Sequence, residues 1–458
     1  MFNRLRNLFT GKRSYDGAQG GRRWRGTPDM PNQLAATLEA RGPLAKRARY
    51  LAGNNALAAS AATAWVSALI GNGIKPQSQH ADTAIRATLN TSFEAWTDVA
   101  DMEGMTDFYG LQGIMARRMV IDGEAFALMI NTDDGLRIRL IDAEQVDASM
   151  SRPTESGRIV QGVEFDATGR RVAYWIIPDQ AGQPYASVAP ARRVDAADVV
   201  HLFRPETPGQ VRGISWFAPA MLRMADLDQW RDAQLMRQKT AALMAGFITS
   251  MDGGATPLEG EQTGTTMIGG LTPGGLHYLA PGQDYKQSTP ALVGAEVIAF
   301  AKMVEREIAV ALGLPATALT GDLSDTNFSS ARVGLIEFRR LVETIQHGVI
   351  AFQALRPIWV RWATTEVLSG RIQTTVAAAM PAKFIPPKTM WVSPKDDVQA
   401  EVMAIDAGLM SRREAVTARG VDIEVLDAER AADADRAKSL GLAPPPANEN
   451  TPPAAIAA

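Results

Sequence analysis

Two long stretches of helical sequence on either side of a small insert constrain the fold of this chain most strongly. The first covers 215–248, where no proline follows Pro219 and the single glycine, Gly246, comes late. About 30 helical residues extend roughly 45 Å, more than twice the length of a typical globular helix. The second covers 292–312, and the insert between them is rich in glycine, threonine and proline. Such long helices bury little surface in one subunit, so we expect them to pack in a bundle within the chain or against neighbouring chains.

The second helix is the clearest in the sequence. Gly313 and Pro315 end it, a polar loop follows, and a very long helix starts near Ser329 and ends at Gly370, with a kink expected at Pro357. The apolar face of the first of these helices comprises Val297, Phe300, Val304, Ile308 and Ala311. The apolar stripe of the longer one comprises Phe338, Leu341, Ile345, Val349, Phe352, Leu355 and Trp359.

The part of the chain before 215 changes from helical to β-rich. Ala-rich segments over 31–117 favour helices, and alternating apolar residues over 118–205 favour strands. Turn sequences within this second region predict two hairpins and one further strand. The predicted strands are AFALMI (125–130), LRIRLI (136–141), IVQGVEF (159–165), RRVAYWII (170–177) and VVHLF (199–203).

The C-terminal part is Pro-rich and then helical. Ser393-Pro394 and the capping box Ser411-x-x-Glu414 are helix start signals. The final residues, APPPANENTPPAAIAA, have the composition of a disordered tail.

Charge is distributed unevenly along the 458 residues. The net charge is −3, and residues 1–25 alone contribute +6, so the remainder sums to −9. A basic arm on an acidic body fits either contact with nucleic acid or a solvated tail without a partner. The absence of cysteine excludes disulfides, a thiolate nucleophile and cysteine-ligated metal.

One uncharged run, residues 51–74, is long enough to span a bilayer. It contains three asparagines, and much of the rest is alanine. We therefore expect a buried core or interface helix over Ala56–Ile70. A membrane-associated scaffold anchored by this run is kept as an alternative.

The motifs of most enzyme classes are absent. The chain has no phosphate-binding P-loop, no nucleophile elbow and no pair of histidines at metal-ligand spacing. His201 is interpreted as a satisfied sheet histidine, and Asp122-Gly123-Glu124 as a tight turn that opens a strand. We expect no enzyme and no cofactor. A metal-dependent DNA-processing enzyme using Asp322/Asp325 or Asp396/Asp397 with Mg²⁺ is the catalytic alternative.

Several stretches in the order found here resemble the portal proteins of lambda-type tailed bacteriophages. The similarity covers roughly 33–440 and is specific through the order and spacing of the motifs. The stretches that carry it are LAGNNALAASAATAWVSALIGNGIKPQSQH (51–80), FYGLQ (108–112), DGEAF (122–126), HLFRPETPGQVRGISWFAP (201–219), DLDQWRDAQL (226–235) and GDLSDTNFSSARVGLIEFRR (321–340).

The resemblance implies an α+β, mainly helical fold with the wing, stem, clip and crown regions of portal proteins. It implies a structural protein forming a ring, usually of twelve copies, at one capsid vertex, as DNA channel and docking platform. The implied regions are a flexible arm (1–30), the wing (31–214), the first stem helix (215–248), the clip (249–291), the second stem helix (292–313), a tunnel loop (314–328), the long kinked helix and return to the wing (329–392), the crown (393–440) and a tail (441–458).

The resemblance also implies partners and contact residues. The expected partners are further copies of the chain, double-stranded DNA bound without sequence preference, the terminase large subunit, head–tail connector proteins, the major capsid protein and scaffold; no membrane is expected. The protein is expected in the virion after assembly in the host cytoplasm. The residues expected nearest DNA are Leu323, Ser324, Asp325, Thr326, Asn327, Phe328 and Ser329. Thr265, Thr266, Tyr278 and Tyr285 are expected to contact terminase or connector, and Arg204 and Arg212 to pair with acids of a neighbouring chain.

Overall fold

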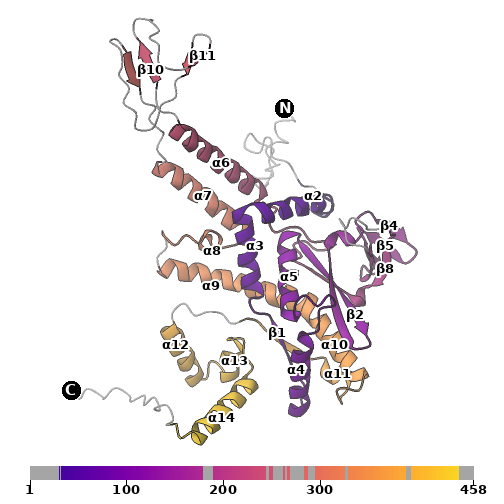
Figure 1. Cartoon of the computed structure of the whole chain (residues 1–458). Coiled ribbons are helices and arrows are strands. Elements are labelled where there is room, and N and C mark those ends of the chain that lie inside the picture. Colours follow the sequence, from indigo (N-terminus) through magenta and orange to yellow (C-terminus); the bar gives the residue numbers. More distant parts are fainter. Residues whose placement is uncertain are drawn as a thin grey trace, which may run out of the picture.

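The computed structural model describes residues 30, 32–178, 189–243, 247–250, 261–263, 266–268, 283–286, 294–324, 328–387 and 394–442. A helical and β-rich body carries a projecting pair of helices, and a separate group of helices ends the chain (Figure 1). The expected arm 1–30 and tail 441–458 lie almost wholly outside the described residues. The fold class is α+β and mainly helical, as expected.

Four capped helices begin the body: α2 (Gln33–Asn54), α3 (Ala56–Leu69), α4 (Thr83–Thr97) and α5 (Phe108–Ile121). Each starts after an Asn or Asp whose side chain accepts a hydrogen bond from a first-turn backbone N–H. Asn55 breaks the uncharged run 51–74 into two helices, and α3 is buried as expected. No helix in the described part of the chain is both long and apolar enough to cross a membrane.

A three-stranded antiparallel sheet packs beside α5. Its order is β3 (Gly135–Ile141), β2 (Glu124–Thr132), β9 (Val199–Phe203), which confirms the first hairpin and the VVHLF strand. The strand β9 is buried along its whole length. The strand β9 is the last strand of this sheet along the chain, and the segment after it leads to the projecting helices.

A second antiparallel sheet corrects one strand prediction. Its strands run in sequence order: β4 (Arg152–Thr154), β5 (Gly157–Val160), β6 (Val163–Asp166), β7 (Arg171–Ile176) and β8 (Arg192–Asp195). The single strand expected over 159–165 is wrong, because the chain reverses at Gln161 and Gly162, with φ angles of 45° and 80°. Glutamine seldom adopts a positive φ, so its sequence gave no turn signal.

The two long helices are α6 (Met221–Leu243) and α7 (Ala295–Leu312). They lie side by side and lead away from the body to small strands at their far end (Figure 1). These strands are β10 (Phe247–Ser250), β11 (Glu261–Thr263), β12 (Thr266–Ile268) and β13 (Gln283–Lys286). The first helix is shorter than 215–248 because residues 216–220 form turns and 247–250 pair with β13.

The very long helix after α8 (Ala316–Thr320) has three parts: α9 (Phe328–Ile345), a π-helical segment η4 (Gln346–Leu355) and α10 (Arg356–Leu368). The π-helical geometry covers ten residues and ends two residues before Pro357, and the kink expected at Pro357 stays a prediction. A π-helix turns less per residue than an α-helix and rotates the following apolar stripe. Phe352, on the stripe by α-helical spacing, is accordingly exposed, whereas Ile350 and Ala354 are buried.

Aromatic rings bring these elements together in the core. Phe93 of α4 contacts Trp96, Phe108, Trp359 and Trp362, with ring centroids 5.0–5.6 Å apart. The strand β1 (Lys75–Ser78) pairs with β14 (Ala382–Ile385), which follows the short helix α11 (Val376–Ala379).

The chain ends in α12 (Pro394–Asp406), α13 (Arg412–Thr417) and α14 (Ile423–Ser439). Both predicted helix starts are confirmed, and Ser411 accepts a hydrogen bond from the Glu414 backbone N–H. Among residues 395 and 397–442, only Ala415 and Thr417 are buried. Arg86 of α4 reaches Glu424 with two hydrogen bonds, of 2.7 and 3.1 Å, and links this unit to the body.

Candidate functional site

The helix pair α6–α7 presents apolar side chains both inward and outward. Val304 and Ile308 of the predicted stripe are buried, whereas Phe300 is 44% exposed. Other apolar side chains on the pair are exposed to a similar or greater extent: Leu222, Leu235, Met236, Ile298, Met303 and Val310. One copy of the chain therefore leaves an apolar surface on these helices uncovered.

Polar and aromatic contacts align the two helices. Arg231 of α6 pairs with Glu305 of α7, and Arg223 lies 3.8 Å from Glu307. The rings of Trp230 and Phe300 are 5.2 Å apart. The alternating charges of the first helix are thus partly matched by its neighbour in the same chain.

The chain after α7 is anchored to α3. Gly313 adopts a left-handed φ of 68°, which ends the helix as predicted. The Trp65 indole N–H donates to the Leu312 carbonyl oxygen at 3.1 Å, and the Ser60 hydroxyl donates to the Leu319 carbonyl oxygen at 2.7 Å. The first half of the expected tunnel loop is therefore the short helix α8 packed on the body.

The residues predicted to lie nearest DNA divide into three groups. Leu323 and Ser324 are exposed at the end of the segment after α8. Asp325, Thr326 and Asn327 lie outside the described residues. Phe328 and Ser329 are the first residues of α9, so this helix starts one residue before Ser329. Their proximity to DNA stays a prediction.

The predicted clip contacts fall at the far end of the helix pair. Thr266 opens β12 opposite Thr263, and Tyr285 lies in β13 opposite Ile248. Thr265 and Tyr278 lie outside the described residues. Contact of these four residues with terminase or connector stays a prediction.

A buried ionic cluster lies where the sheet meets the chain leading to α6. Glu124 accepts two bonds from Arg212, Nη2 to Oε1 at 2.7 Å and Nε to Oε2 at 2.9 Å, and one from Arg41 Nη1 at 2.9 Å. His201 Nε2 lies 3.1 Å from Glu124 Oε2, and its Nδ1 lies 3.2 Å from the Tyr174 hydroxyl. We call these five residues the Glu124 cluster. It joins α2, β2, β7 and β9 to the segment before α6.

Electrostatics favours an ionised glutamate and a neutral histidine in this cluster. Burial alone would raise the pKa of Glu124, but the charges of Arg212 and Arg41 and the His201 hydrogen bond hold it well below its ordinary value. Burial lowers the pKa of His201 to about 4 despite its contact with Glu124. A neutral His201 can donate from Nε2 to Glu124 and accept at Nδ1 from Tyr174. The interpretation of His201 as a satisfied sheet histidine is confirmed.

The prediction for Arg212 is wrong. Its side chain is fully buried and pairs with Glu124 of its own chain, so it cannot pair with an acid of a neighbouring chain. Arg204 differs, because its guanidinium lies over the Trp216 ring, 5.5 Å from the ring centroid. For Arg204 an inter-subunit pair stays a prediction.

Sequence reasoning missed Glu124, Arg41 and Arg49 as structural residues. Asp122-Gly123-Glu124 is a turn opening a strand, as predicted, but both carboxylates also have arginine partners. Asp122 Oδ1 lies 2.6 Å from Arg49 Nε, and Arg49 also pairs with Asp142 and Glu144. The sequence did contain one indication that these acids need partners: Asp122 and Glu124 stand at the start of a strand that is otherwise largely buried.

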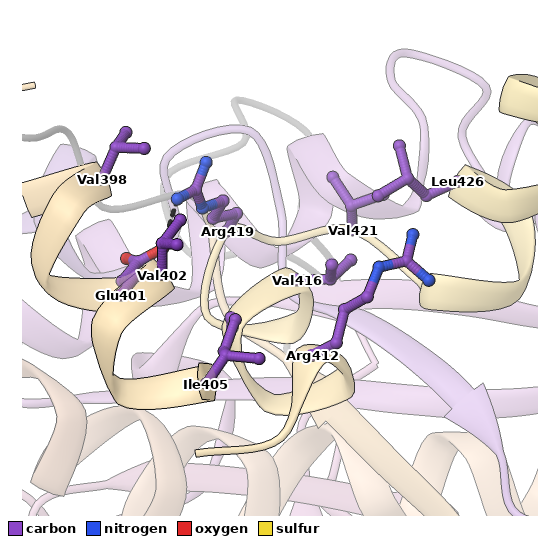
Figure 2. Close-up of a pocket in the computed structure, with 10 residues that line it drawn as sticks. Val398, Glu401, Val402, Ile405, Arg412, Val416, Arg419, Val421 and Leu426 are labelled. Carbon is purple, nitrogen blue, oxygen red and sulfur yellow. Dashed lines mark hydrogen bonds and ion pairs between the residues drawn. The ribbon is translucent and has the colours of Figure 1, made fainter. Parts of the chain in front are cut away.

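An apolar pocket lies between the C-terminal helices (Figure 2). Its volume is about 340 Å³, and aliphatic side chains of α12, α13 and α14 line it, with Arg412, Arg419 and Glu401 also in its lining. Arg419 pairs with Glu401 in this pocket (Figure 2). The pocket has no cluster of titratable groups of the kind acid–base chemistry requires.

The carboxylates of the catalytic alternative have other roles in the structure. Asp322 pairs with Lys302 at 3.0 Å, and Asp396 and Asp397 belong to the first turn of α12. Asp325 lies outside the described residues. Within the described ranges no three His, Asp or Glu side chains gather in a group that could hold a metal ion.

Two curated relatives are phage portal proteins. The chain is 24% identical over 381 residues to the probable portal protein of Halomonas phage phiHAP-1, covering 80% of this chain and 73% of that protein. It is 25% identical over 317 residues to portal protein B of Escherichia phage lambda, covering 62% of this chain and 60% of that protein.

A solved structure shares the fold. A chain from the neck of an empty gene transfer agent particle superposes with a TM-score of 0.50 at 15% identity, covering 92% of this chain and 96% of that chain. A family profile described as phage portal protein, lambda family, matches residues 19–346, which is most of the chain. Together with the projecting helix pair and its terminal strands, these matches show that the chain belongs to the lambda family of phage portal proteins.

Proposed function

We propose that twelve copies of this chain form a ring at one vertex of a phage-type capsid, and that DNA enters and leaves through the ring. Members of the family are structural proteins, and the chain is not an enzyme. The observation that carries the proposal is the uncovered apolar surface on the projecting pair α6–α7.

A ring accounts for this surface. Each helix pair has two flanks, and a contact between different flanks of successive copies closes into a ring when the rotation per copy fits. The structurally similar neck chain comes from a map computed with sixfold symmetry, which a ring of twelve copies also satisfies. The exposed apolar side chains of α6 and α7 would then be buried between neighbours.

The charge of the chain suits a conduit that does not hold its DNA. Cationic contacts to phosphates add salt-dependent affinity, and six to ten of them change binding by about 10³–10⁵ between low and moderate salt. The chain beyond residue 25 carries −9, so this part of twelve copies, without the basic residues 1–25, carries −108 formal charges. In this proposal residues 323–329 are the part of each copy nearest DNA, and binding has no sequence preference.

The remaining partners are assigned by region. The strands at the far end of the helix pair, within 249–291, would dock the terminase large subunit during packaging and head–tail connector proteins afterwards. The wing, 31–214, would meet the major capsid protein and scaffold. The site of action is the virion, after assembly in the host cytoplasm.

Electron microscopy of the purified full-length protein, classified for end-on rotational symmetry, tests the ring. We expect rings with a central channel and twelve subunits, alone or after addition of capsid protein and scaffold. Particles of the assembled capsid with no ring at any vertex would refute the proposal. A nuclease assay with Mg²⁺ and a liposome flotation assay test the two alternatives in parallel.

A further inference from the structure

One ammonium group holds the segment after α8 against α7. Lys302 Nζ lies 3.0 Å from Asp322 Oδ2 and donates to the Ser324 hydroxyl oxygen at 2.9 Å. The Ser324 backbone N–H donates to Asp322 Oδ1 at 2.9 Å, and the Asp322 N–H donates to the Thr320 hydroxyl oxygen at 3.1 Å. Asp322 and Ser324 therefore both bind the same residue of α7, Lys302.

The backbone permits this arrangement at one glycine. Gly321 ends α8 with a left-handed φ of 72°, and its N–H donates to the Thr317 carbonyl oxygen. The chain therefore reverses direction at the end of α8 and brings Asp322 and Ser324 back toward α7. A β-carbon at Gly321 would meet no neighbouring atom, so the conformation and not crowding requires glycine there.

Lys302 is the last of three anchors along this part of the chain. Trp65 holds Leu312, Ser60 holds Leu319, and Lys302 holds Asp322 and Ser324. The first two anchors use backbone carbonyls in the packed body. The third uses side chains that stay partly exposed, 28% for Lys302 and 40% for Asp322, so it is the anchor that ionic conditions can weaken.

We propose that Lys302 is a positioning residue, which fixes Asp322 and Ser324 against α7 and so sets the point at which the chain leaves the body after α8. The inference rests on the proposed function, in which the loop faces DNA. Asp322 is then a structural partner of Lys302 and not a metal ligand.

The test combines a local measurement with a functional one on the full chain. Hydrogen exchange of purified protein reports on the Ser324 amide, whose acceptor is Asp322, and DNA content of assembled particles reports on the loop. For Lys302→Met, which keeps the aliphatic stem, we expect exchange at 321–324 to rise about fivefold, the factor given by an exposed ion pair at the strong end of the measured range. We expect DNA-filled particles to fall several-fold.

Two further variants and a salt series separate positioning from general damage. Lys302→Arg keeps the positive charge and the N–H donors toward Asp322 and Ser324, so both readouts should stay near those of wild type. Arg412→Met removes a more exposed ion pair, with Asp427 in the C-terminal helices, and should change neither readout. At about 1 M salt the exchange of wild type should approach that of Lys302→Met, because the pair is screened.

Each result decides a different point. Unchanged exchange in Lys302→Met would show that the ammonium does not hold the segment and would overturn the inference. Faster exchange with normal DNA filling would overturn the positioning role and leave the proposed function intact. If particles assembled without this protein still fill with DNA, the proposed function fails, and the inference fails with it.

Discussion

Gly213 and Gly123 lie with their backbones in direct contact where the chain turns from the sheet toward α6. A β-carbon on Gly213 would lie 2.0 Å from the Gly123 carbonyl oxygen, and one on Gly123 would lie 2.1 Å from the Ile214 carbonyl carbon. The Gly213 N–H also donates to Glu124 at 3.0 Å. This contact and the Glu124 cluster together fix the segment before α6 against the sheet.

Gly213→Ala should destabilise the protein by about 1–3 kcal/mol or more, because the added methyl group meets backbone that cannot move aside like a side chain. Gly334→Ala on α9 is the matched control, since a β-carbon there meets nothing within 4 Å and alanine favours helix. Urea unfolding of both variants measures the difference. Equal midpoints would contradict the contact.

Removing one partner of the Glu124–Arg212 pair should be costly. Arg212→Met leaves a buried carboxylate with fewer partners, and losses of about 3–5 kcal/mol are typical for such pairs. Arg139→Met, at an exposed position of β3, should change the free energy of unfolding by less than about 0.5 kcal/mol. Chemical denaturation measures both, and a loss below 1 kcal/mol for Arg212→Met would argue against a tightly buried pair.

His201 should make the protein less stable in acid. Its pKa is about 4 in the folded chain because of burial, against an ordinary 6.5, so the unfolded chain binds the extra proton first. The contribution is fully present above pH 6.5 and is lost as the pH falls toward 4. His201→Gln should flatten the stability curve in this window by up to about 1.4 kcal/mol per pH unit. Parallel curves for both proteins would show that His201 is protonated when folded.

Two substitutions on α7 should separate folding from assembly. Ile308→Asp places a charge in the core and should cost several kcal/mol of stability, because a buried unpaired charge is unfavourable. Val310→Asp, at a position 79% exposed, should leave the melting temperature of the monomer unchanged and reduce oligomer formation. Sedimentation and thermal melting distinguish them. Wild-type assembly of Val310→Asp would remove this position from the interface.

Arg86→Met should loosen the C-terminal helices without unfolding the body. The loss of two hydrogen bonds to Glu424 should raise the rate of proteolysis within 394–442 up to about fivefold. Arg413→Met removes a contact to the same glutamate from within the C-terminal unit and serves as control. Equal proteolysis of the two variants would show that Arg86 does not attach the unit.

Local sequence signals predicted the elements that local interactions determine. The hairpin of β2 and β3, the helix α3 and the start of α13 each have their turn or cap residues within a few positions. The strand over 159–165 was mispredicted because its turn uses Gln161 at positive φ. In the apolar stripe after Val349, Leu355 and Trp359 are buried as predicted, whereas the exposure of Phe352 was missed because nothing in the side chains marks the π-helix in which it lies.

The Glu124 cluster could not be assembled from sequence, since its members are distant along the chain. Arg41 is 83 residues and Arg212 is 88 residues from Glu124. Arginine on a turn is normally solvated, so Arg212 was expected at the surface. Which arginine lies beside a buried carboxylate depends on strand pairing and helix packing together.

The pairing of β1 with β14 sets the earliest point during synthesis at which the fold of the body can be completed. Its two strands, Lys75–Ser78 and Ala382–Ile385, are about 300 residues apart, so a ribosome making 5–20 residues per second needs roughly 15–60 s between them. During that interval Phe93 of α4 lacks two of its partners in the core, Trp359 and Trp362 of α10. The body therefore closes only after residue 385 has been made, and until then the nascent chain carries β1 without its partner strand.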